Sequence, residues 1–324
     1  MKALKLNPTL NKLVTILSDG QYHDGTSIGK SLAITRGAVW KVVQKLTAYG
    51  IKIDSIKGKG YALIEPMVLL DKKNIKKNLQ PTIELEIFET LDSTNTYLKS
   101  FFHSAKPRLC FAEQQTNGKG RMQRDWYSPF ARNIYLSCLY PFHRDVSALS
   151  GLSLVVSLAI VETLKTFNLP KPVLVKWPND VMYADKKLSG ILIEIQAETH
   201  GMCSAIIGIG FNVNMLTDEM HQIAKPWISL REMLGEYVDR NQLSAMLINN
   251  LFAYLNDFTK FGLSKFIDQW QEVDYLRGRN IKLLNAKQTV TGNVKGIDQQ
   301  GHLLIKLTDG ELQTFSSGDA TIQF

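Results

Sequence analysis

Five short segments of the sequence carry the cationic and amide side chains from which a phosphate-handling site can be built. They are DSTN at 92–95, EQQTNGKGRMQRDW at 113–126, KWPND at 176–180, KKLSG at 186–190 and GIGFNVN at 208–214. These residue types suit a site that neutralises phosphates and orients a small polar ligand without forming a covalent bond to the protein.

Several other kinds of catalytic site lack their residues. The six histidines are scattered and no HExxH occurs, so a histidine-based zinc site is not expected. There is no GxSxG nucleophile elbow. The GKGR run at 118–121 lacks the Ser or Thr of a Walker A loop, and its N-terminal side shows no GxGxxG. We assign no metal ligands, because no carboxylate cluster marks them.

The tripeptide Gly-Lys-Gly occurs twice, at 58–60 and at 118–120, so it decides nothing by itself. The second copy is followed by Arg121, Arg124 and Trp126. Backbone N–H groups of a glycine-rich loop can hold anionic oxygens, and an indole offers a face for a purine. The first copy lies among lysines, where we expect it to close a hairpin.

The first 66 residues have the pattern of a winged helix-turn-helix. Apolar residues recur with helical spacing over 9–18, Thr26 or Ser27 can cap a second helix through Ala33, and Thr35 can cap a third. The alternating IKIDSI, the turn KGKG and the run YALI then predict a β-hairpin. A helical bundle that binds protein is the alternative.

Most of the net charge of +8 lies in this first unit. Residues 1–66 hold ten basic and four acidic residues, a net of +6, whereas residues 67–324 hold 28 and 26, a net of +2. This asymmetry favours nucleic acid as a partner, although a solvated basic face stays open on charge alone.

In this motif the third helix enters the major groove and the wing reaches phosphates. The candidate DNA-contacting residues are Thr35, Arg36, Gly37, Trp40, Lys41 and Gln44 on the helix, with Lys57 and Lys59 on the wing. Trp40 has a second interpretation, because it can equally well pack inside the unit.

The chain of 324 residues predicts roughly two or three domains of the α+β class. We assign residues 1–66 to the first domain, 67–274 to a mixed domain and 275–324 to a small β-barrel. Expected strands are IELEIFE, NIYLSCLY, VLVKW, SGILIEIQAE and SAIIGIGFNVN, the last two forming a hairpin, and expected helices are a long one over ALSGLSLVVSLAIVETLKTF and others at 240–259 and 263–271.

The composition is that of an ordinary globular protein, with 44% hydrophobic and 21% charged residues. The longest strongly apolar run, LVVSLAIV, is short of a membrane span, and the first residues lack a secretory signal. Three separated cysteines without a CxxC pair favour a reducing compartment. We therefore expect a cytoplasmic protein without a membrane partner.

The segments GKGRMQRDWYSPF, KWPND, KKLSG and GIGFNVN, in this order and spacing, resemble the bifunctional biotin–protein ligase and biotin operon repressor family. The helix-turn-helix and an SH3-like C-terminal barrel match too, so the resemblance covers essentially the whole chain. It implies a central biotin/lipoyl-ligase-like domain that makes biotinyl-5′-AMP from biotin and ATP. Biotin then passes to a lysine of the biotin carboxyl carrier domain of acetyl-CoA carboxylase.

The resemblance also implies repression of biotin-synthesis genes. A homodimer would form when biotinyl-AMP is bound, and its paired winged helices would bind operator DNA. No tightly bound cofactor is implied, since biotin and ATP are substrates and Mg²⁺ would arrive with ATP.

The resemblance further implies roles for single residues. Those matched to biotin are Ser93, Thr94, Asn95, Gln115, Lys119, Gly120, Arg121 and Lys187, and those matched to ATP or the adenylate are Arg121, Arg124, Trp126, Lys176, Asn179 and Asn212. Lys187 and Arg121 are the implied catalytic residues, because cations there offset the repulsion between a carboxylate and a phosphate.

Plainer roles stay open for some of these residues. Ser93 and Thr94 are also good helix caps, Trp126 suits an apolar core, and Lys176 and Asn212 suit a surface and a turn.

Two positions depart from the glycine-rich pattern of the family, which usually reads Gly-Arg-Gly-Arg-x-Gly-Arg, and a third departure lies near the end of the chain. Lys119 replaces the first arginine, and Gln123 replaces the third glycine and should stiffen the loop. Gln323 stands where some relatives have an arginine, so no nucleotide contact is assigned there.

Three functional alternatives remain at this stage. They are a lipoate or octanoate ligase, a ligase whose first domain does not repress, and a non-catalytic biotin-sensing repressor. The helix-turn-helix argues against the first, and Arg121 and Lys187 argue against the last.

Overall fold

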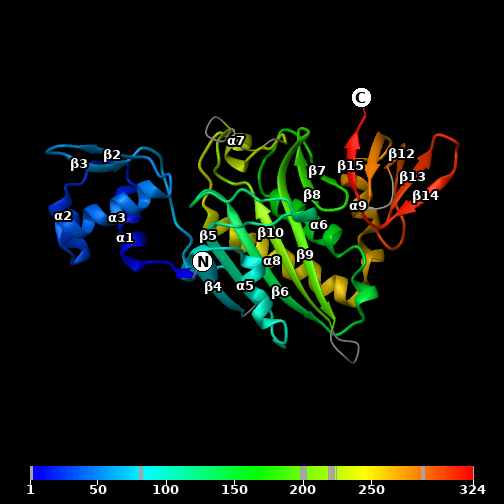
Figure 1. Cartoon of the computed structure of the whole chain (residues 1–324), viewed down its shortest axis with the longest axis horizontal. Helices are drawn as coiled ribbons and strands as arrows, with labels where there is room; N and C mark the ends of the chain where they lie inside the picture. The colour runs from blue at the N-terminus through cyan, green and yellow to red at the C-terminus, as the bar shows by residue number, and fades with distance from the viewer. Residues whose placement is uncertain are drawn as a thin grey trace.

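The computed structural model of the protein describes residues 3–79, 83–197, 203–217, 223, 225–285 and 289–323. Three units follow one another along the long axis (Figure 1). A small helical unit lies at one end, a broad sheet with its helices lies in the middle, and a small all-β unit lies at the other end.

The N-terminal unit has the predicted elements α1 (Pro8–Leu17), α2 (Gly25–Leu32), α3 (Arg36–Ala48), β2 (Ile53–Ile56) and β3 (Gly60–Leu63). Thr35 caps α3 as predicted, since its Oγ1 accepts the Ala38 N–H at 3.2 Å. The predicted cap of α2 was wrong. Asp24 caps it by accepting the N–H groups of Thr26 and Ser27 at 2.9 and 3.0 Å, because a carboxylate just before the first turn reaches both donors.

The central sheet has eight strands in the order β1-β4-β5-β6-β10-β9-β8-β7, and only β4 and β5 pair in parallel. The strands are β1 (Leu4–Lys5), β4 (Glu84–Leu91), β5 (Arg108–Gln115), β6 (Ile134–Phe142), β7 (Val173–Lys176), β8 (Asp180–Tyr183), β9 (Lys186–Ala197) and β10 (Cys203–Phe211). The predicted β9–β10 hairpin is confirmed. Strand β8 was not predicted, because four residues after a turn carry too little periodicity.

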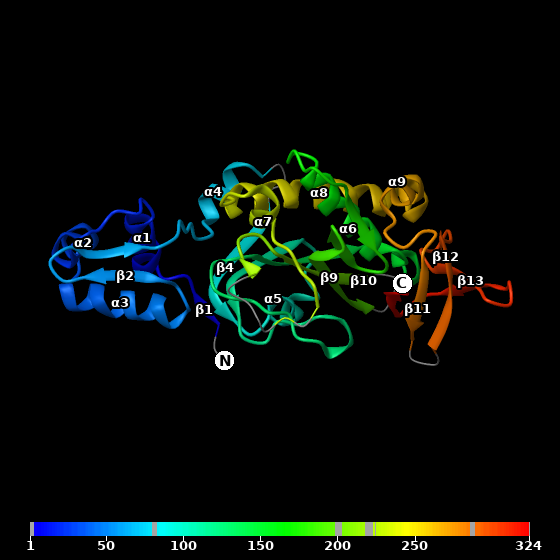
Figure 2. The same ribbon diagram turned by 90° about the horizontal axis from the view of Figure 1, so that it is seen from above.

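Helices cover both faces of this sheet. Figure 2 shows α6 and α8 on one side and α5 on the other. The helices are α4 (Lys72–Lys77), α5 (Thr94–Leu98), α6 (Leu152–Leu164), α7 (Leu230–Leu234), α8 (Arg240–Phe261) and α9 (Ile267–Val273), with short 3-10 turns η1 (Lys99–Phe101), η2 (Arg121–Gln123), η3 (Val146–Leu149) and η5 (Leu263–Phe266). The α+β class is therefore confirmed.

The long apolar helix of the sequence prediction is interrupted. Gly151 takes φ +79° and separates η3 from α6. Together Val146–Leu164 is long and apolar enough to cross a membrane, which the shorter run in the sequence did not indicate. Of this stretch 61% is buried, because α6 packs between the sheet and α8 as a core helix.

A fully buried ion pair joins β5 to α8. The Arg240 Nη1 donates to the Glu113 Oε2 at 2.7 Å, and both side chains have no exposed surface. The guanidinium also donates to the carbonyls of Val68 and Asn133, while the other Glu113 oxygen accepts the Leu70 N–H at 2.5 Å. The pair therefore ties the segment leaving the N-terminal unit to the central sheet.

The N-terminal unit shares its apolar core with the central domain. Phe130 and Ala131, which follow the glycine-rich segment, are buried in the same cluster as α1 and α3. The Tyr49 ring stacks on Phe130 with centroids 4.3 Å apart. Tyr49 also donates its hydroxyl to buried Glu89 of β4 at 2.6 Å, and Lys45 of α3 forms an ion pair with the same carboxylate.

The C-terminal unit, predicted as a small β-barrel, is a five-stranded antiparallel sheet in the order β14-β13-β12-β11-β15. Its strands are β11 (Asn280–Leu284), β12 (Thr289–Ile297), β13 (Leu303–Leu307), β14 (Leu312–Phe315) and β15 (Asp319–Ile322). Trp177, just after β7, donates its indole N–H to the Gly301 carbonyl at 3.0 Å and so attaches this unit to the central domain.

Arg240→Ala should lower the free energy of unfolding by about 3–5 kcal/mol, because it leaves the Glu113 carboxylate buried without its partner. Urea denaturation measures this loss. Lys265→Ala is the matched control, since it breaks the exposed pair with Asp257 and should cost only about 0–1 kcal/mol. Equal losses in the two variants would contradict the role given to the buried pair.

Candidate functional site

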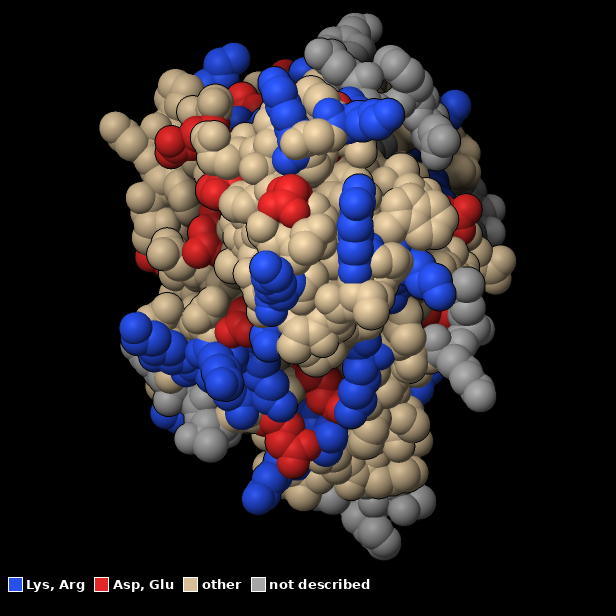
Figure 3. Space-filling view, turned by 90° about the vertical axis from the view of Figure 1, so that its left-hand side faces the viewer, with Lys and Arg blue, Asp and Glu red and all other residues tan. Residues whose placement is uncertain are grey.

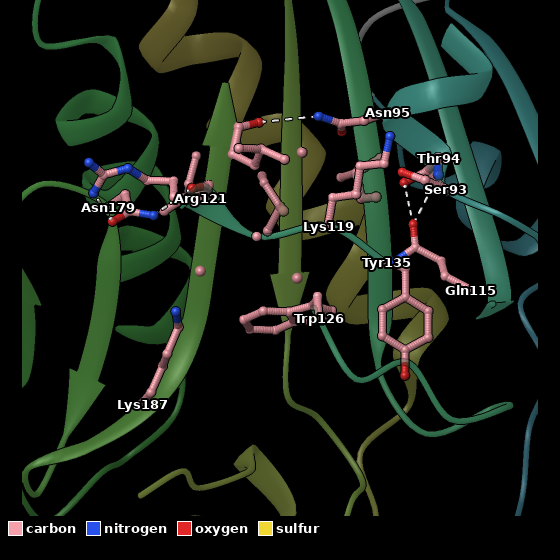
Figure 4. Close-up of a pocket in the computed structure, with 18 residues that line it drawn as sticks. Ser93, Thr94, Asn95, Gln115, Lys119, Arg121, Trp126, Tyr135, Asn179 and Lys187 are labelled. Carbon is pink, nitrogen blue, oxygen red and sulfur yellow. Dashed lines mark hydrogen bonds between the residues drawn. The ribbon is translucent and has the colours of Figure 1, made fainter. Parts of the chain in front are cut away.

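One cavity gathers most of the biotin- and nucleotide-binding residues predicted from the sequence. It is lined by Ser93, Thr94, Asn95, Gln115, Lys119, Gly120, Arg121, Trp126, Asn179 and Lys187, and also by Tyr135, Leu136, Gly190, Ile191, Leu192, Gly208, Ile209 and Gly210. In Figure 4 the hydroxyl and amide side chains lie at one end, Arg121, Asn179 and Lys187 at the other, and Lys119 and Trp126 between them.

The polar end is built where β4 runs into α5. Ser93 is the N-cap of α5, and its Oγ accepts the Thr96 N–H at 3.5 Å, so its capping role is real. The Gln115 Oε1 accepts both the N–H and the hydroxyl of Thr94, at 2.9 and 3.0 Å. Ser93 and Thr94 therefore act in local structure and also line the cavity.

Asn95 is oriented by a residue that the sequence analysis missed. Its Nδ2 donates to the Glu194 Oε2 at 2.9 Å, and its Oδ1 lies 2.6 Å from the Ser137 Oγ at the cavity. Burial opposes the charge on Glu194, but hydrogen bonds from Lys99 and Asn95 outweigh it and lower the pKa. Glu194 therefore stays ionised and fixes which side of the Asn95 amide faces inward.

The floor of the cavity consists of glycines on paired strands. Gly190 of β9 lies opposite Gly210 of β10, and a Cβ on Gly210 would come within 2.3 Å of the Trp126 ring. A Cβ on Gly208 would come within 2.3 Å of the Asn95 Oδ1. The missing side chains therefore make room for Asn95 and for the indole. The alternation Gly-Ile-Gly at 208–210 is visible in the sequence. That its glycines face the cavity becomes clear only when β10 is seen paired with β9.

The indole of Trp126 lies on this floor and is half-buried. This burial is intermediate between that of a core residue and that of a freely exposed ring available to adenine, the two roles predicted for it. The Lys187 Nζ is 5.1 Å from the ring centroid. The indole N–H is buried without a partner among the described residues, so it is a donor that a ligand can use.

The cationic end carries two positive groups that are already oriented. The Lys187 Nζ pairs with the Asp180 carboxylate at 2.7 Å. The Arg121 Nη1 donates to the Asn179 Oδ1 at 3.0 Å, and Asn179 is held in turn by donating to the Ile191 carbonyl at 2.7 Å. Burial lowers the pKa of Arg121, although Asp180 and Asp319 oppose this.

The glycine-rich segment folds back on itself over the cavity. The Gly120 N–H donates to the Arg124 carbonyl at 2.7 Å, and the Trp126 N–H donates to the Gly118 carbonyl at 2.8 Å. Met122 and Gln123 have φ of +54° and +57°, a region that favours glycine. Gln123 thus stands at a position where the glycine of the family pattern would fit with less strain.

Three predicted nucleotide residues do not line the cavity. Arg124 is about half-exposed and pairs with Asp319. Lys176 ends β7, and its pKa is lowered chiefly by burial, so it is no ordinary surface lysine. Asn212 is 4% exposed and donates to the Lys187 carbonyl at 3.3 Å, so it supports Lys187 through the backbone. Their roles toward a nucleotide stay predictions.

The proposed DNA-contacting residues lie on the surface of the N-terminal unit. Thr35, Arg36, Gly37, Trp40, Lys41, Gln44, Lys57 and Lys59 are all exposed. Trp40 is 53% exposed, so it faces solvent rather than the core. Figure 3 shows Lys and Arg side chains spread over this end of the molecule. Within the described residues, no group of three or more His, Cys, Asp or Glu is placed to hold a metal ion.

Three family profiles match this chain. The profile of the HTH domain matches residues 9–62, that of the Biotin/lipoate A/B protein ligase family matches residues 87–212, and that of the Biotin protein ligase C terminal domain matches residues 277–321.

Known relatives cover the chain almost completely. The bifunctional ligase/repressor BirA of Escherichia coli strain K12 is 36% identical over 99% of both chains, and BirA of Bacillus subtilis is 28% identical over 96% of this chain and 98% of its own. Among solved structures, a biotin protein ligase from Aquifex aeolicus in complex with biotin and ATP superposes with a TM-score of 0.64. It is 28% identical and covers 74% of this chain and 98% of its own.

Gly210→Ala should displace the Trp126 indole, because the new Cβ would overlap the ring. We expect a red shift of the tryptophan emission, measured against the double variant Gly210→Ala/Trp126→Phe, which should lose the shift. Gly208→Ala is the matched control, since its Cβ meets Asn95 and leaves the indole in place. An unshifted spectrum for Gly210→Ala would refute the glycine floor.

Proposed function

This chain belongs to the family of bifunctional biotin–protein ligases and repressors, and from that premise we propose that it activates biotin with ATP, biotinylates a carrier protein and represses transcription. The observation that carries the ligase function is a cavity that joins a neutral polar end to a cationic end. Biotin has a matching shape, with a polar ureido ring at one end and a carboxylate at the other.

The polar end suits the ureido ring. That ring has two N–H donors and one carbonyl, and Asn95 presents its Oδ1 beside Ser137 while Ser93 and Thr94 contribute hydroxyls. A site built to hydrogen-bond such groups discriminates strongly against a ligand that lacks them. Lipoate has no ureido group, and this favours biotin over lipoate or octanoate.

The cationic end suits the first chemical step. The biotin carboxylate attacks the α-phosphorus of ATP, the bond to the β-phosphate oxygen breaks, and pyrophosphate leaves. Arg121 and Lys187 offset the repulsion between the approaching anions and stabilise the charge on the five-coordinate phosphorus. Lys187 is available because its ammonium group can exchange Asp180, its present partner, for a phosphate oxygen. Trp126 offers a ring face to the adenine.

The second step takes place at the carboxyl carbon of biotin, which is now activated as a mixed anhydride. The amine of a lysine on the biotin carboxyl carrier domain of acetyl-CoA carboxylase attacks the acyl carbon of biotinyl-5′-AMP. The mixed anhydride bond breaks, AMP leaves, and the amide remains on the carrier. The segment 118–126, with Lys119 and Gly120, closes over the adenylate and limits its hydrolysis by water.

Nucleotide enters as its Mg²⁺ complex in this proposal. Mg²⁺ prefers octahedral oxygen ligands and is commonly held by phosphates with few protein groups. We place the reaction in the cytoplasm, where ATP is available and thiols stay reduced, and Cys110, Cys138 and Cys203 are all free.

The repressor function is supported by the exposed face of α3 and by its attachment to the ligand site. Arg36, Trp40 and Lys41 are exposed on α3. Lys45 of this helix and Tyr49, which caps its C-terminal end, bind Glu89. Glu89 lies on the strand that ends at the polar end of the cavity. Ligand binding at that end and the orientation of α3 therefore share one strand.

A homodimer is proposed at the outer edge of β9. Residues Lys186–Gly190 pair with β8, whereas Ile193–Ala197 pair with β10 alone within the described part of the chain. Ile195 on this edge is 42% exposed. A second copy can add its own β9 there and continue the sheet, because an unpaired strand edge presents free N–H and carbonyl groups.

Lys187→Ala should reduce adenylate formation by about 100-fold or more, because a positioned cation at the reacting phosphate is lost. The assay incubates protein with biotin, ATP and the carrier domain and measures pyrophosphate release and carrier biotinylation. Lys186→Ala is the matched control, since this exposed neighbour does not line the cavity.

Two results would contradict the ligase proposal. One is near-normal turnover by Lys187→Ala, which would remove its assigned role. The other is product with lipoate or octanoate and none with biotin, which would assign the wild-type protein to a different acid.

DNA upstream of biotin-synthesis genes should bind more tightly when biotin and ATP are both present, because the adenylate stabilises the dimer. Lys41→Ala should weaken this binding about tenfold through a lost phosphate contact. Gel-shift titrations at fixed salt measure both effects, with Lys72→Ala of α4 as the control for charge alone. Binding that does not respond to biotin and ATP would refute the corepressor role.

A further inference from the structure

One carboxylate of the C-terminal unit sits where two cations of the central domain converge. The Asp319 Oδ2 accepts from the Arg124 Nη2 at 2.5 Å and lies 3.5 Å from the Lys225 Nζ. The adjacent Gly318 carbonyl accepts from the Arg121 Nη2 at 3.3 Å. Neither Lys225 nor Asp319 was selected by the sequence analysis.

Lys225 is carried on a strip of backbone that pairs with Lys187. The Lys187 N–H donates to the Pro226 carbonyl at 3.0 Å, and the Ile228 N–H donates to the Lys187 carbonyl at 3.0 Å. Trp227, between them, is buried. Lys225 therefore has a defined position relative to the cationic end of the cavity.

The charge around this point is unbalanced. Five cations, namely Arg121, Arg124, Lys176, Lys187 and Lys225, are matched by the carboxylates of Asp180 and Asp319 within the described part of the chain. Burial lowers the pKa of Lys176 most. Asp180 and Asp319 oppose this shift, whereas Lys225 and Lys187 add to it. An excess of positive charge in a partly buried region favours a polyanion.

Asp319 is ionised in this setting. Burial raises its pKa, but the hydrogen bond from Arg124 and the charges of Lys225, Arg124 and Lys176 outweigh that effect and lower the pKa overall. Its carboxylate therefore marks a point where an anionic oxygen can accept hydrogen bonds from Arg124 and Lys225 together.

We propose that Lys225, with Arg124, binds the β- and γ-phosphates of ATP, and that Asp319 holds these two cations in the free protein until the phosphates displace it. This inference rests on the proposed ligase function and extends it by a phosphate-binding residue and a competing carboxylate. On this proposal the first step, adenylation, needs Lys225, and the second step, transfer to the carrier, does not. Adenylation uses the β- and γ-phosphates, and transfer from biotinyl-AMP does not.

Lys225→Ala should raise the KM for ATP roughly fivefold to tenfold, because one charge-assisted contact to phosphate is lost. Inhibition by added pyrophosphate should weaken by a similar factor. Transfer from supplied biotinyl-AMP to the carrier should keep its wild-type rate. Lys225→Arg should restore most of the affinity for ATP, and Lys265→Ala, which removes an exposed lysine elsewhere, should change none of these values.

Asp319→Asn should act in the opposite direction. It keeps the size of the side chain and removes the competing charge, so the KM for ATP should fall about threefold and pyrophosphate should inhibit more strongly. Asp298→Asn is the matched control, because this carboxylate of the same unit pairs with His302 instead. A raised KM for ATP in Asp319→Asn would overturn the competition.

The inference on Lys225 fails if pyrophosphate inhibits the Lys225→Ala variant as strongly as it inhibits the wild-type protein. It also fails if the substitution slows transfer from biotinyl-AMP as much as it slows adenylation. The second result would indicate a general structural role. Failure of the proposed function is a different result, since a wild-type protein that releases no pyrophosphate from biotin and ATP refutes the ligase itself.

Discussion

The buried ion pair between Glu113 and Arg240 is the interaction on which the rest of the structure depends. Desolvating two charges is costly, and it is offset only when the remaining hydrogen bonds are made. Here the backbone meets that need, since Leu70 donates to the carboxylate and Val68 accepts from the guanidinium. The pair thus fixes the segment leaving the N-terminal unit and the end of β5, two residues before Gln115.

The site combines a rigid part with parts brought from elsewhere. Paired strands supply the glycine floor, and the cap of α5 supplies the hydroxyls at the polar end. The cations lie on the segment over the cavity, on a strand and on the strip at 225–228, and the C-terminal unit touches them through Asp319. This arrangement lets the anionic ligand itself complete the site, because Asp180 and Asp319 offset the mutual repulsion among the cations only in part and phosphates relieve the rest.

A few contacts also connect the ligand cavity to helix α3, the proposed DNA-binding helix. Phe130 lies shortly after the segment over the cavity, and its ring is part of the N-terminal core, stacked on Tyr49 at the end of α3. Glu89 holds Tyr49 and Lys45 from the strand that leads to Ser93. Two short chains of contacts, one through Phe130 and one through Glu89, therefore connect the cavity to the helix that carries the exposed Trp40.

The sequence by itself determined what depends on neighbours along the chain. Apolar spacing located α1 and α3, the turn KGKG located the wing, and the ordered motifs located ten of the cavity residues and the family. Only the tertiary structure decided what depends on distant partners. Arg240 lies 127 residues from Glu113, and Asp319 lies 195 residues from Arg124. No local pattern encodes such pairs, because a charged residue bound for a buried partner looks in the sequence like any solvated one.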